Sequence, residues 1–192
     1  MFTLYFAPGS SSMAVHIALH EIGVAFEARP MSFKNGELRS PGYLALNREG
    51  KVPTLVIDGR PLTEVAAILY YLAKRFPDAE LLPRNDLGAD ARAVSWMSFA
   101  AATLHPARRR GLEYAKQVYG IADRRLGDGW AIGRYSIADI HLFRLWWRLS
   151  NSLKPEPETF PNLTAHYARM MARPAVQRTI EIEVAVGYEL PA

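Results

Sequence analysis

The stretch from Gly50 to Gly59 constrains the backbone more tightly than any other part of the chain. Pro53 has no N–H group and belongs at the first residue of a strand, and it pushes Val52 before it into an extended conformation. Thr54 to Ile57 is a short run rich in β-branched residues, and the Asp58-Gly59 pair that follows is a strong hairpin signal. An extended Val52 just outside the strand would have its backbone N–H and C=O free to pair with a peptide-like ligand. An ordinary loop that enters a buried strand would give the same pattern.

The composition is that of a globular protein without a thiol of its own. The chain has 192 residues, of which 49% are hydrophobic and 22% charged, enough for one large or two small domains. It contains no cysteine, which excludes disulfides, thiolate metal ligands and any mechanism through a protein thiol. Any sulfur chemistry must therefore be brought by a ligand.

The charge and hydropathy patterns favour a small-molecule partner in the cytoplasm. The net charge is +4, and the basic residues are spread along the chain except at Arg108–Arg110, so nucleic-acid binding is not favoured. No apolar run reaches the roughly 18 residues that span a bilayer, and the first residues lack the basic start of a secretory signal. We therefore expect a cytoplasmic protein that does not bind a membrane.

The first 76 residues show the pattern of a βαβ unit followed by a ββα unit. Strands are predicted over residues 2–6, 24–31, 54–57 and 60–62, with helices that end at Gly23, pass through Tyr43 and begin at Thr63. A strand, a helix and a strand in succession predict a crossover with parallel pairing. The two units together predict a four-stranded sheet with helices on both faces.

The rest of the chain is predicted to be helical. Two prolines without a helical period mark residues 77–85 as a linker. Helices are expected over residues 86–105, 108–126, 140–149, 162–172 and 174–186. Ser136–Asp139 is a capping box ahead of an apolar helix, so Asp139 is assigned to folding. The predicted organisation is an α/β domain at 1–76, a linker at 77–85 and an all-α domain at 86–192.

Short motifs follow one another in order along nearly the whole chain: Tyr5–Ser12, His16–Leu19, Asn47 with Gly50–Pro53, Leu62–Glu64, Trp96 through His105, Gly133 with Ser136–Asp139, and Arg173–Val176. In this order they resemble the motifs of cytosolic glutathione S-transferases of bacterial, beta-like type. The resemblance implies a thioredoxin-like first domain, an all-α second domain that carries the electrophile pocket, and a homodimer. It also implies glutathione as co-substrate and no metal.

The resemblance also implies where glutathione binds. The proline that matches Pro53 is cis in the family, and the backbone at the position of Val52 pairs with the cysteinyl part of glutathione. Glu64 and the backbone N–H of Val65 would receive the γ-glutamyl end, although an acid in a first helical turn needs no ligand to explain it. Many relatives carry serine where this chain has Val65, so a hydroxyl contact is missing here. The candidates for the glycyl carboxylate are Lys51 and Lys34.

Catalysis in this family lowers the pKa of the glutathione thiol, and a hydroxyl or thiol near the first helix can stabilise the resulting thiolate. Ser11 stands where beta-type enzymes carry cysteine, so it is the preferred donor. Tyr5, which matches the strand-end tyrosine of other members, is second, and Ser10 is third. Each of these residues would also serve as an ordinary cap, loop or strand residue.

Four further residues are of types that binding or metal sites use. His105 matches a histidine beside the substrate pocket of beta-type relatives, and Ser98 matches a position that reaches the partner subunit's glutathione site. His16 and His20 lie one helical turn apart, as zinc ligands can, but the sequence offers no evident third ligand and helix packing is the preferred interpretation.

The sequence therefore predicts a detoxifying glutathione transferase that conjugates the glutathione thiolate to apolar electrophilic small molecules. One alternative is another glutathione-dependent enzyme on the same fold, such as an isomerase, a dehalogenase or an ether-cleaving lyase. A second alternative is a non-catalytic module that binds glutathione or mediates an interaction.

Overall fold

The computed structural model describes residues 1–190, and the chain divides into two compact units. The first unit contains Met1–Leu72 together with the segment that starts at Pro174, and the second contains Ala73–Arg173. The first unit is discontinuous in sequence because helix α9 (Pro174–Val186) packs against helix α1 (Ser12–Ile22). The boundaries predicted from sequence count α9 with the all-α domain instead, because a helical period does not reveal what a helix packs against.

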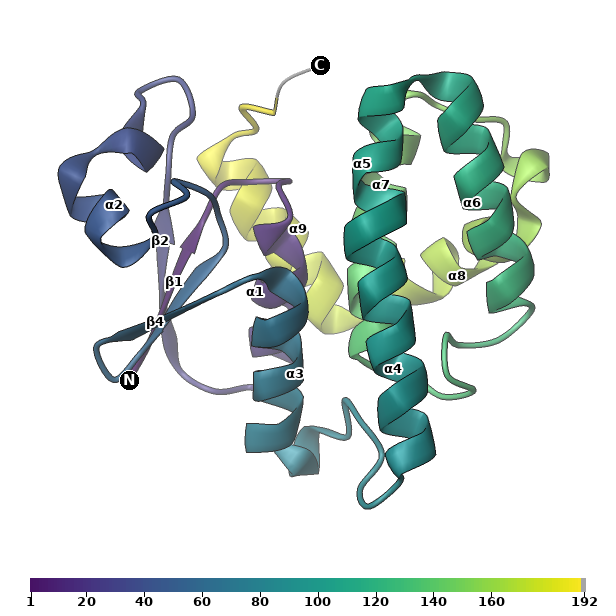
Figure 1. Cartoon of the computed structure of the whole chain (residues 1–192), viewed down its shortest axis with the longest axis horizontal. Coiled ribbons are helices and arrows are strands. Elements are labelled where there is room, and N and C mark those ends of the chain that lie inside the picture. Colours follow the sequence, from purple (N-terminus) through teal and green to yellow (C-terminus); the bar gives the residue numbers. More distant parts are fainter. Residues whose placement is uncertain (191–192) are drawn as a thin grey trace. The chain divides into compact units, whose positions relative to one another are not determined.

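The first unit is built on a four-stranded mixed sheet with the strand order β2-β1-β3-β4. Its strands are β1 (Phe2–Phe6), β2 (Phe26–Pro30), β3 (Thr54–Ile57) and β4 (Arg60–Thr63). β1 pairs in parallel with β2, whereas β3 is antiparallel to both β1 and β4. Figure 1 shows α2 (Pro41–Leu46) on one side of the sheet and α1 and α3 (Val65–Arg75) on the other. The predicted fold class of this unit is thereby confirmed.

The alternation of side chains in β1 separates two apolar clusters. Phe6 is buried on the α1 side, where its ring lies 4.9 Å from that of His16. Tyr5 faces the other way and packs against the cluster of Ala7, Leu38, Tyr43 and Val52 beside α2. Burial of a large apolar side chain stabilises a fold by about 1.5–3 kcal/mol, so both faces hold the end of β1 in place.

The second unit is helical in its described residues. Its helices are α4 (Leu87–Phe99), α5 (His105–Ala107), α6 (Leu112–Leu126), α7 (Ile137–Ser152) and α8 (Pro161–Met171). The helix predicted over 86–105 contains a wide π turn at Ala100–Leu104. The helix predicted from Arg108 begins only at Leu112, because Gly111 has a φ of 99°, which interrupts the helix and which glycine adopts without a steric penalty. No helix within residues 1–190 is long and apolar enough to cross a membrane.

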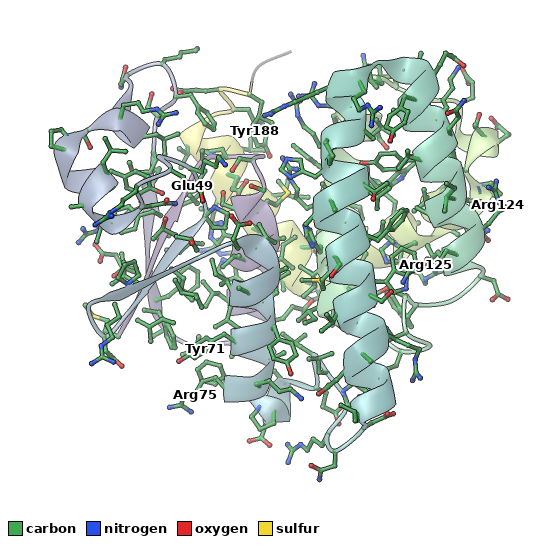
Figure 2. All side chains as sticks on the ribbon, viewed as in Figure 1. Glu49, Tyr71, Arg75, Arg124, Arg125 and Tyr188 are labelled. Atoms are coloured by element: carbon green, nitrogen blue, oxygen red, sulfur yellow. The ribbon has the colours of Figure 1, made fainter. Side chains whose placement is uncertain are left out.

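Aromatic side chains fill the interior of the second unit. The ring of Trp146 lies 5.9 Å from that of Tyr119 and 5.3 Å from that of Phe160, as expected for helix packing. Arg125, which Figure 2 shows near the end of α6, places its guanidinium 4.1 Å from the ring centroid of Trp96. Such a contact adds a cation–π attraction to the packing of α4 on α6.

The predicted capping box at the start of α7 is present and extends further than its four residues. Asp139 Oδ2 accepts hydrogen bonds from the Ser136 N–H at 2.9 Å and the Ser136 hydroxyl at 3.0 Å, and Ser136 Oγ accepts one from the Ala138 N–H at 3.2 Å. Asp139 Oδ1 accepts the Ala131 N–H at 2.8 Å and lies 3.1 Å from His166 Nε2. The box therefore joins α7, the preceding loop and α8 through one buried carboxylate.

A second buried group on α7 predicts how the stability depends on pH. Burial, followed by repulsion from His105 and Arg144, lowers the pKa of His141 from 6.5 to about 3. Between these two values the unfolded chain binds a proton that the folded chain excludes, so acid favours unfolding. The contribution of His141 to the free energy of unfolding is therefore expected to be complete above about pH 6.5. Below that pH the free energy of unfolding is expected to fall, by up to about 1.4 kcal/mol per pH unit from this group.

Urea denaturation at a series of pH values measures this slope. His141→Gln removes the titrating group and is expected to flatten the slope, whereas His105→Gln, at an exposed histidine, is expected to change it far less. A His141→Gln variant that keeps the parental slope would contradict the assignment.

Candidate active site

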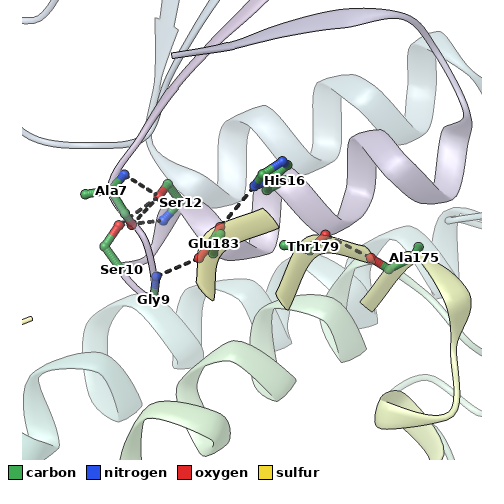
Figure 3. A network of polar contacts seen from close by, with 8 residues as sticks. All are labelled: Ala7, Gly9, Ser10, Ser12, His16, Ala175, Thr179 and Glu183. Atoms are coloured by element: carbon green, nitrogen blue, oxygen red, sulfur yellow. Dashed lines mark hydrogen bonds and ion pairs between the residues drawn. The ribbon is translucent and has the colours of Figure 1, made fainter. Parts of the chain in front are cut away.

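The turn between β1 and α1 is held together by two of its three serines (Figure 3). Ser12 Oγ accepts a hydrogen bond from the Ala7 N–H at 3.1 Å and donates one to the Ala7 carbonyl at 3.2 Å. Ser10 Oγ lies 2.8 Å from Ser12 Oγ and accepts the Ser12 N–H at 3.3 Å. Both serines are buried. The hydroxyl of Ser10, one of the predicted donors, is therefore engaged in shaping the turn.

Ser11, which is only partly buried, points toward the loop that precedes β3. Its hydroxyl donates to the Val52 carbonyl at 3.1 Å. The Val52–Pro53 peptide bond is cis, as the family resemblance implied. The expectation that the Val52 carbonyl is free was wrong, because a contact from a residue 41 positions away in sequence leaves no local signal. The Val52 N–H makes no hydrogen bond to any residue between 1 and 190 that the structure describes.

A polar network behind Val52 fixes the loop that carries it. The Lys51 carbonyl accepts hydrogen bonds from the Tyr43 hydroxyl at 2.5 Å and from Asn47 Nδ2 at 2.8 Å. Thr54 Oγ1 lies 2.9 Å from the same hydroxyl and accepts the Asn47 amide at 3.1 Å. Burial raises the pKa of Tyr43, so its hydroxyl stays a donor. Sequence reasoning singled out only Asn47, because the hydrogen bonds that join Tyr43, Asn47 and Thr54 form only after folding.

Gly50 is the residue that lets this loop pass close to its neighbour. Its φ is 59°, and a Cβ atom there would lie 2.6 Å from the Leu38 carbonyl oxygen. Both the backbone conformation and the space therefore favour glycine at this position.

The two candidate lysines lie on exposed loops of the first unit. Lys51 Nζ donates to Glu49 Oε2 at 2.6 Å, and the Lys51 side chain is 71% exposed. The Lys34 N–H donates at 3.1 Å to the carboxylate of Glu189, which also accepts the Ser32 hydroxyl at 2.9 and 3.0 Å. Each lysine therefore already has a carboxylate neighbour with which an anionic ligand would compete.

Glu64 stands at the start of α3 in an unusual conformation. Its φ is 70°, in the region that non-glycine residues seldom adopt at a cost of about 1–3 kcal/mol, and such strain clusters at functional sites. Helix α3 begins at Val65 and not at the predicted Thr63, because Thr63 still pairs with Thr54 in the sheet. The side chain of Glu64 is exposed, whereas that of Val65 is buried.

Tyr5 directs its hydroxyl toward β2. Its oxygen accepts a hydrogen bond from Arg29 Nη1 at 2.9 Å, and the same guanidinium pairs with Glu27. The ring of Tyr5 lies 5.5 Å from that of Tyr43. Of the three predicted donors, Ser11 is the one whose hydroxyl lies at the Val52 backbone.

The remaining predicted residues fall in two places. His105 and Ser98 are exposed residues of the second unit, on α5 and α4. The rings of His16 and His20 stack 5.0 Å apart in the first unit. Within residues 1–190 no three His, Cys, Asp or Glu side chains are grouped so that they could hold a metal ion.

Sequence reasoning missed Glu183 on α9. Its carboxylate is fully buried, accepts the Gly9 N–H at 2.6 Å through Oε2 and lies 3.0 Å from His16 Nδ1 through Oε1 (Figure 3). A glutamate within a helical pattern is normally exposed to solvent, and no local sequence signal distinguishes a buried one from an exposed one.

Comparisons with known proteins agree with this geometry. Residues 1–74 match the model of the glutathione S-transferase N-terminal domain, and residues 93–174 match that of the C-terminal domain. The glutathione S-transferase GstA of Escherichia coli O157:H7 is 31% identical over 94% of this chain and 98% of its own length.

Two solved structures show the same fold over nearly their whole length. A glutathione transferase homologue from Sulfitobacter with bound glutathione is 31% identical, with a TM-score of 0.83 over 95% of this chain and 98% of that one. A bacterial beta class glutathione S-transferase from Sphingomonas chungbukensis is 32% identical, with a TM-score of 0.80 over 94% and 98%. This chain therefore belongs to the glutathione S-transferase family and is a glutathione transferase.

Proposed function

We propose that the enzyme joins the thiolate of glutathione to apolar electrophilic small molecules, with Ser11 as the thiolate-stabilising donor. The observation that carries this proposal is the hydrogen bond from the Ser11 hydroxyl to the carbonyl of Val52, beside the cis Pro53. It brings the preferred donor to the backbone that the family uses for the cysteinyl part of glutathione. The Sulfitobacter relative with bound glutathione supports the choice of ligand.

The remaining residues supply contacts along the tripeptide. The N–H and C=O of Val52 would pair with the cysteinyl backbone. The Glu64 carboxylate would pair with the γ-glutamyl ammonium, while the N–H of Val65 at the start of α3 would donate to the γ-glutamyl carboxylate. Lys51 and Lys34 would attract the glycyl carboxylate.

Binding and activation are linked through Val52 in this proposal. Without ligand, the Ser11 hydroxyl donates a hydrogen bond to the Val52 carbonyl. A cysteinyl N–H that takes over this carbonyl would release the hydroxyl, which then donates to the glutathione sulfur. A donor to the anion favours the thiolate, and the N-terminus of α1 adds a partial positive charge. The thiol proton leaves to solvent, and the sulfur electron pair forms the new bond to the electrophilic carbon. With an aromatic halide, the carbon–halogen bond then breaks and halide leaves with its electron pair.

The second unit is proposed to supply the electrophile pocket. His105 is its candidate polar residue, and Ser98 is the candidate contact to the partner subunit's glutathione in a homodimer. A cytoplasmic location, which the hydropathy pattern favours, and a role in detoxification, which the family resemblance implies, complete the proposal.

Retention on immobilised glutathione and conjugation of a generic aromatic halide test the proposed function. The parent protein is expected to bind glutathione with a KM within the range of about 1 µM to 1 mM that is typical of enzymes, and to turn it over. Failure to bind at millimolar glutathione would overturn the proposal. Binding without turnover of any electrophile class would favour a binding module instead.

Glu64→Gln sharpens this test, because it removes one charge at the γ-glutamyl end and keeps the shape. The KM for glutathione is expected to rise about tenfold while kcat changes little, as for the loss of a uniform binding contact. Glu80→Gln is the matched control, since Glu80 is another exposed glutamate with a positive φ of 52°. Equal effects of the two substitutions would remove Glu64 from the site.

A further inference from the structure

Helix α9 places a buried carboxylate directly beneath the turn that carries Ser11 (Figure 3). Glu183 is fully buried, and its Oε2 accepts the N–H of Gly9 at 2.6 Å. Gly9 itself has a φ of 70° and lies two residues before Ser11. The bond is charge-assisted, and bonds of this kind are roughly twice as strong as those between neutral groups.

The other oxygen of the carboxylate is held by α1. Glu183 Oε1 lies 3.0 Å from Nδ1 of His16, which is also fully buried. The His16 ring is fixed in turn, because it stacks on His20 at 5.0 Å and packs against Phe6 at 4.9 Å. The carboxylate therefore has one orientation, with its second oxygen aimed at the backbone of the turn.

A purely structural contact between α1 and α9 does not require this arrangement. Removing a carboxylate from water is costly, and apolar side chains of similar volume usually pack two helices together at least as well. What a hydrophobic residue cannot do is accept the N–H of Gly9 and so define the position of the turn. The buried acid therefore points to a requirement of the turn itself.

We propose that Glu183 is a positioning residue for Ser11. By holding Gly9, and with it the Ser10–Ser12 network that begins one residue later, Glu183 fixes where the Ser11 hydroxyl points. His16 acts one step further away by orienting the carboxylate. The inference rests on the proposed role of Ser11 as donor to the thiolate.

The pKa of the thiol in bound glutathione is the decisive measurement, read from the ultraviolet absorbance of the thiolate as the pH is varied. Glu183→Ala releases the turn and is expected to raise this thiol pKa by about one unit, which lowers kcat by up to about tenfold when it is measured at a pH below both pKa values. The KM for glutathione is expected to change less than about threefold, since the contacts at Val52 and Glu64 are untouched. Glu183→Gln keeps an acceptor for Gly9 without the charge, so a smaller shift in the same direction is expected.

Thr179→Val is the matched control for packing. Thr179 is fully buried one turn earlier on α9 and donates only within its own helix, to the Ala175 carbonyl at 2.8 Å. It is expected to lower the melting temperature without moving the thiol titration. If Glu183→Ala also lowers only the melting temperature, the proposal is wrong and the contact is structural.

A second variant and a second measurement allow the proposal to be tested even if Glu183→Ala does not fold. If Glu183→Ala does not fold, Glu183→Gln decides, and an unchanged thiol titration in that variant overturns the proposal. The amide proton signal of Gly9 in a nuclear magnetic resonance spectrum is expected to shift and exchange faster in Glu183→Gln, even without glutathione. A parent protein that does not bind glutathione would refute the proposed function, whereas an unperturbed Gly9 amide in Glu183→Gln would refute the positioning role alone.

Discussion

Replacing Asp139 by alanine is expected to lower the free energy of unfolding by about 3–5 kcal/mol, the range found when one member of a buried polar network is removed. The Asp139 carboxylate is fully buried, accepts hydrogen bonds from Ser136 and Ala131, and also contacts the His166 ring nitrogen. Its loss leaves two backbone N–H groups without their acceptor in the interior. Urea denaturation followed by circular dichroism measures the change.

Asp86→Ala is the matched control, because Asp86 also caps a helix but does so at the surface. Its side chain accepts the Ala89 N–H at 2.8 Å at the start of α4. Loss of an exposed cap costs about 1 kcal/mol. If the two variants are destabilised equally, the buried network around Asp139 contributes nothing beyond capping.

Ser11→Ala is expected to lower kcat for conjugation by on the order of 100-fold, a typical result of removing one donor to a developing or bound anion. Tyr5→Phe is expected to leave kcat within about threefold, because the Tyr5 hydroxyl points toward Arg29 on β2 and its ring lies on the α2 side of the sheet. Steady-state kinetics with an aromatic halide, together with the pH titration of the bound thiol, measure both effects.

Two further variants separate loss of the donor from damage to the turn. Ser11→Thr keeps a hydroxyl and is expected to retain most of the activity. Ser10→Ala breaks a buried turn contact and is expected to lower the melting temperature more than Ser11→Ala does. An active Ser11→Ala variant beside an inactive Tyr5→Phe variant would reverse the assigned order of donors.

Much of the first unit is predictable because its signals are local. The strand at Thr54–Ile57 and the helix at Pro174–Val186 were predicted with the bounds that the structure has. In both cases a proline stands at, or directly before, the first residue of the element. The capping box at Ser136 was predictable for the same reason, since its partners lie within three residues of one another.

The parts of the site that sequence reasoning missed depend on residues distant in the chain. The hydrogen bond from Ser11 to Val52 and the contact of Glu183 with Gly9 span 41 and 174 positions. No periodicity or spacing encodes such pairs, because they form only when separate elements meet. The hydrogen bond that Arg29 donates to the Tyr5 hydroxyl oxygen, across 24 positions, is of this kind too.

The return of the chain to its first unit at Pro174 also affects the order of events during synthesis. A ribosome that has released residues only as far as Arg173 has exposed the whole sheet and all of the second unit, but not the helix that carries Glu183. The Gly9 N–H in the turn before Ser11 must then wait for its acceptor until α9 emerges. The nascent protein would thus acquire its ordered catalytic turn only after the whole second unit has been made, so that a product terminated before α9 would carry the Ser11 site without the group that orders it.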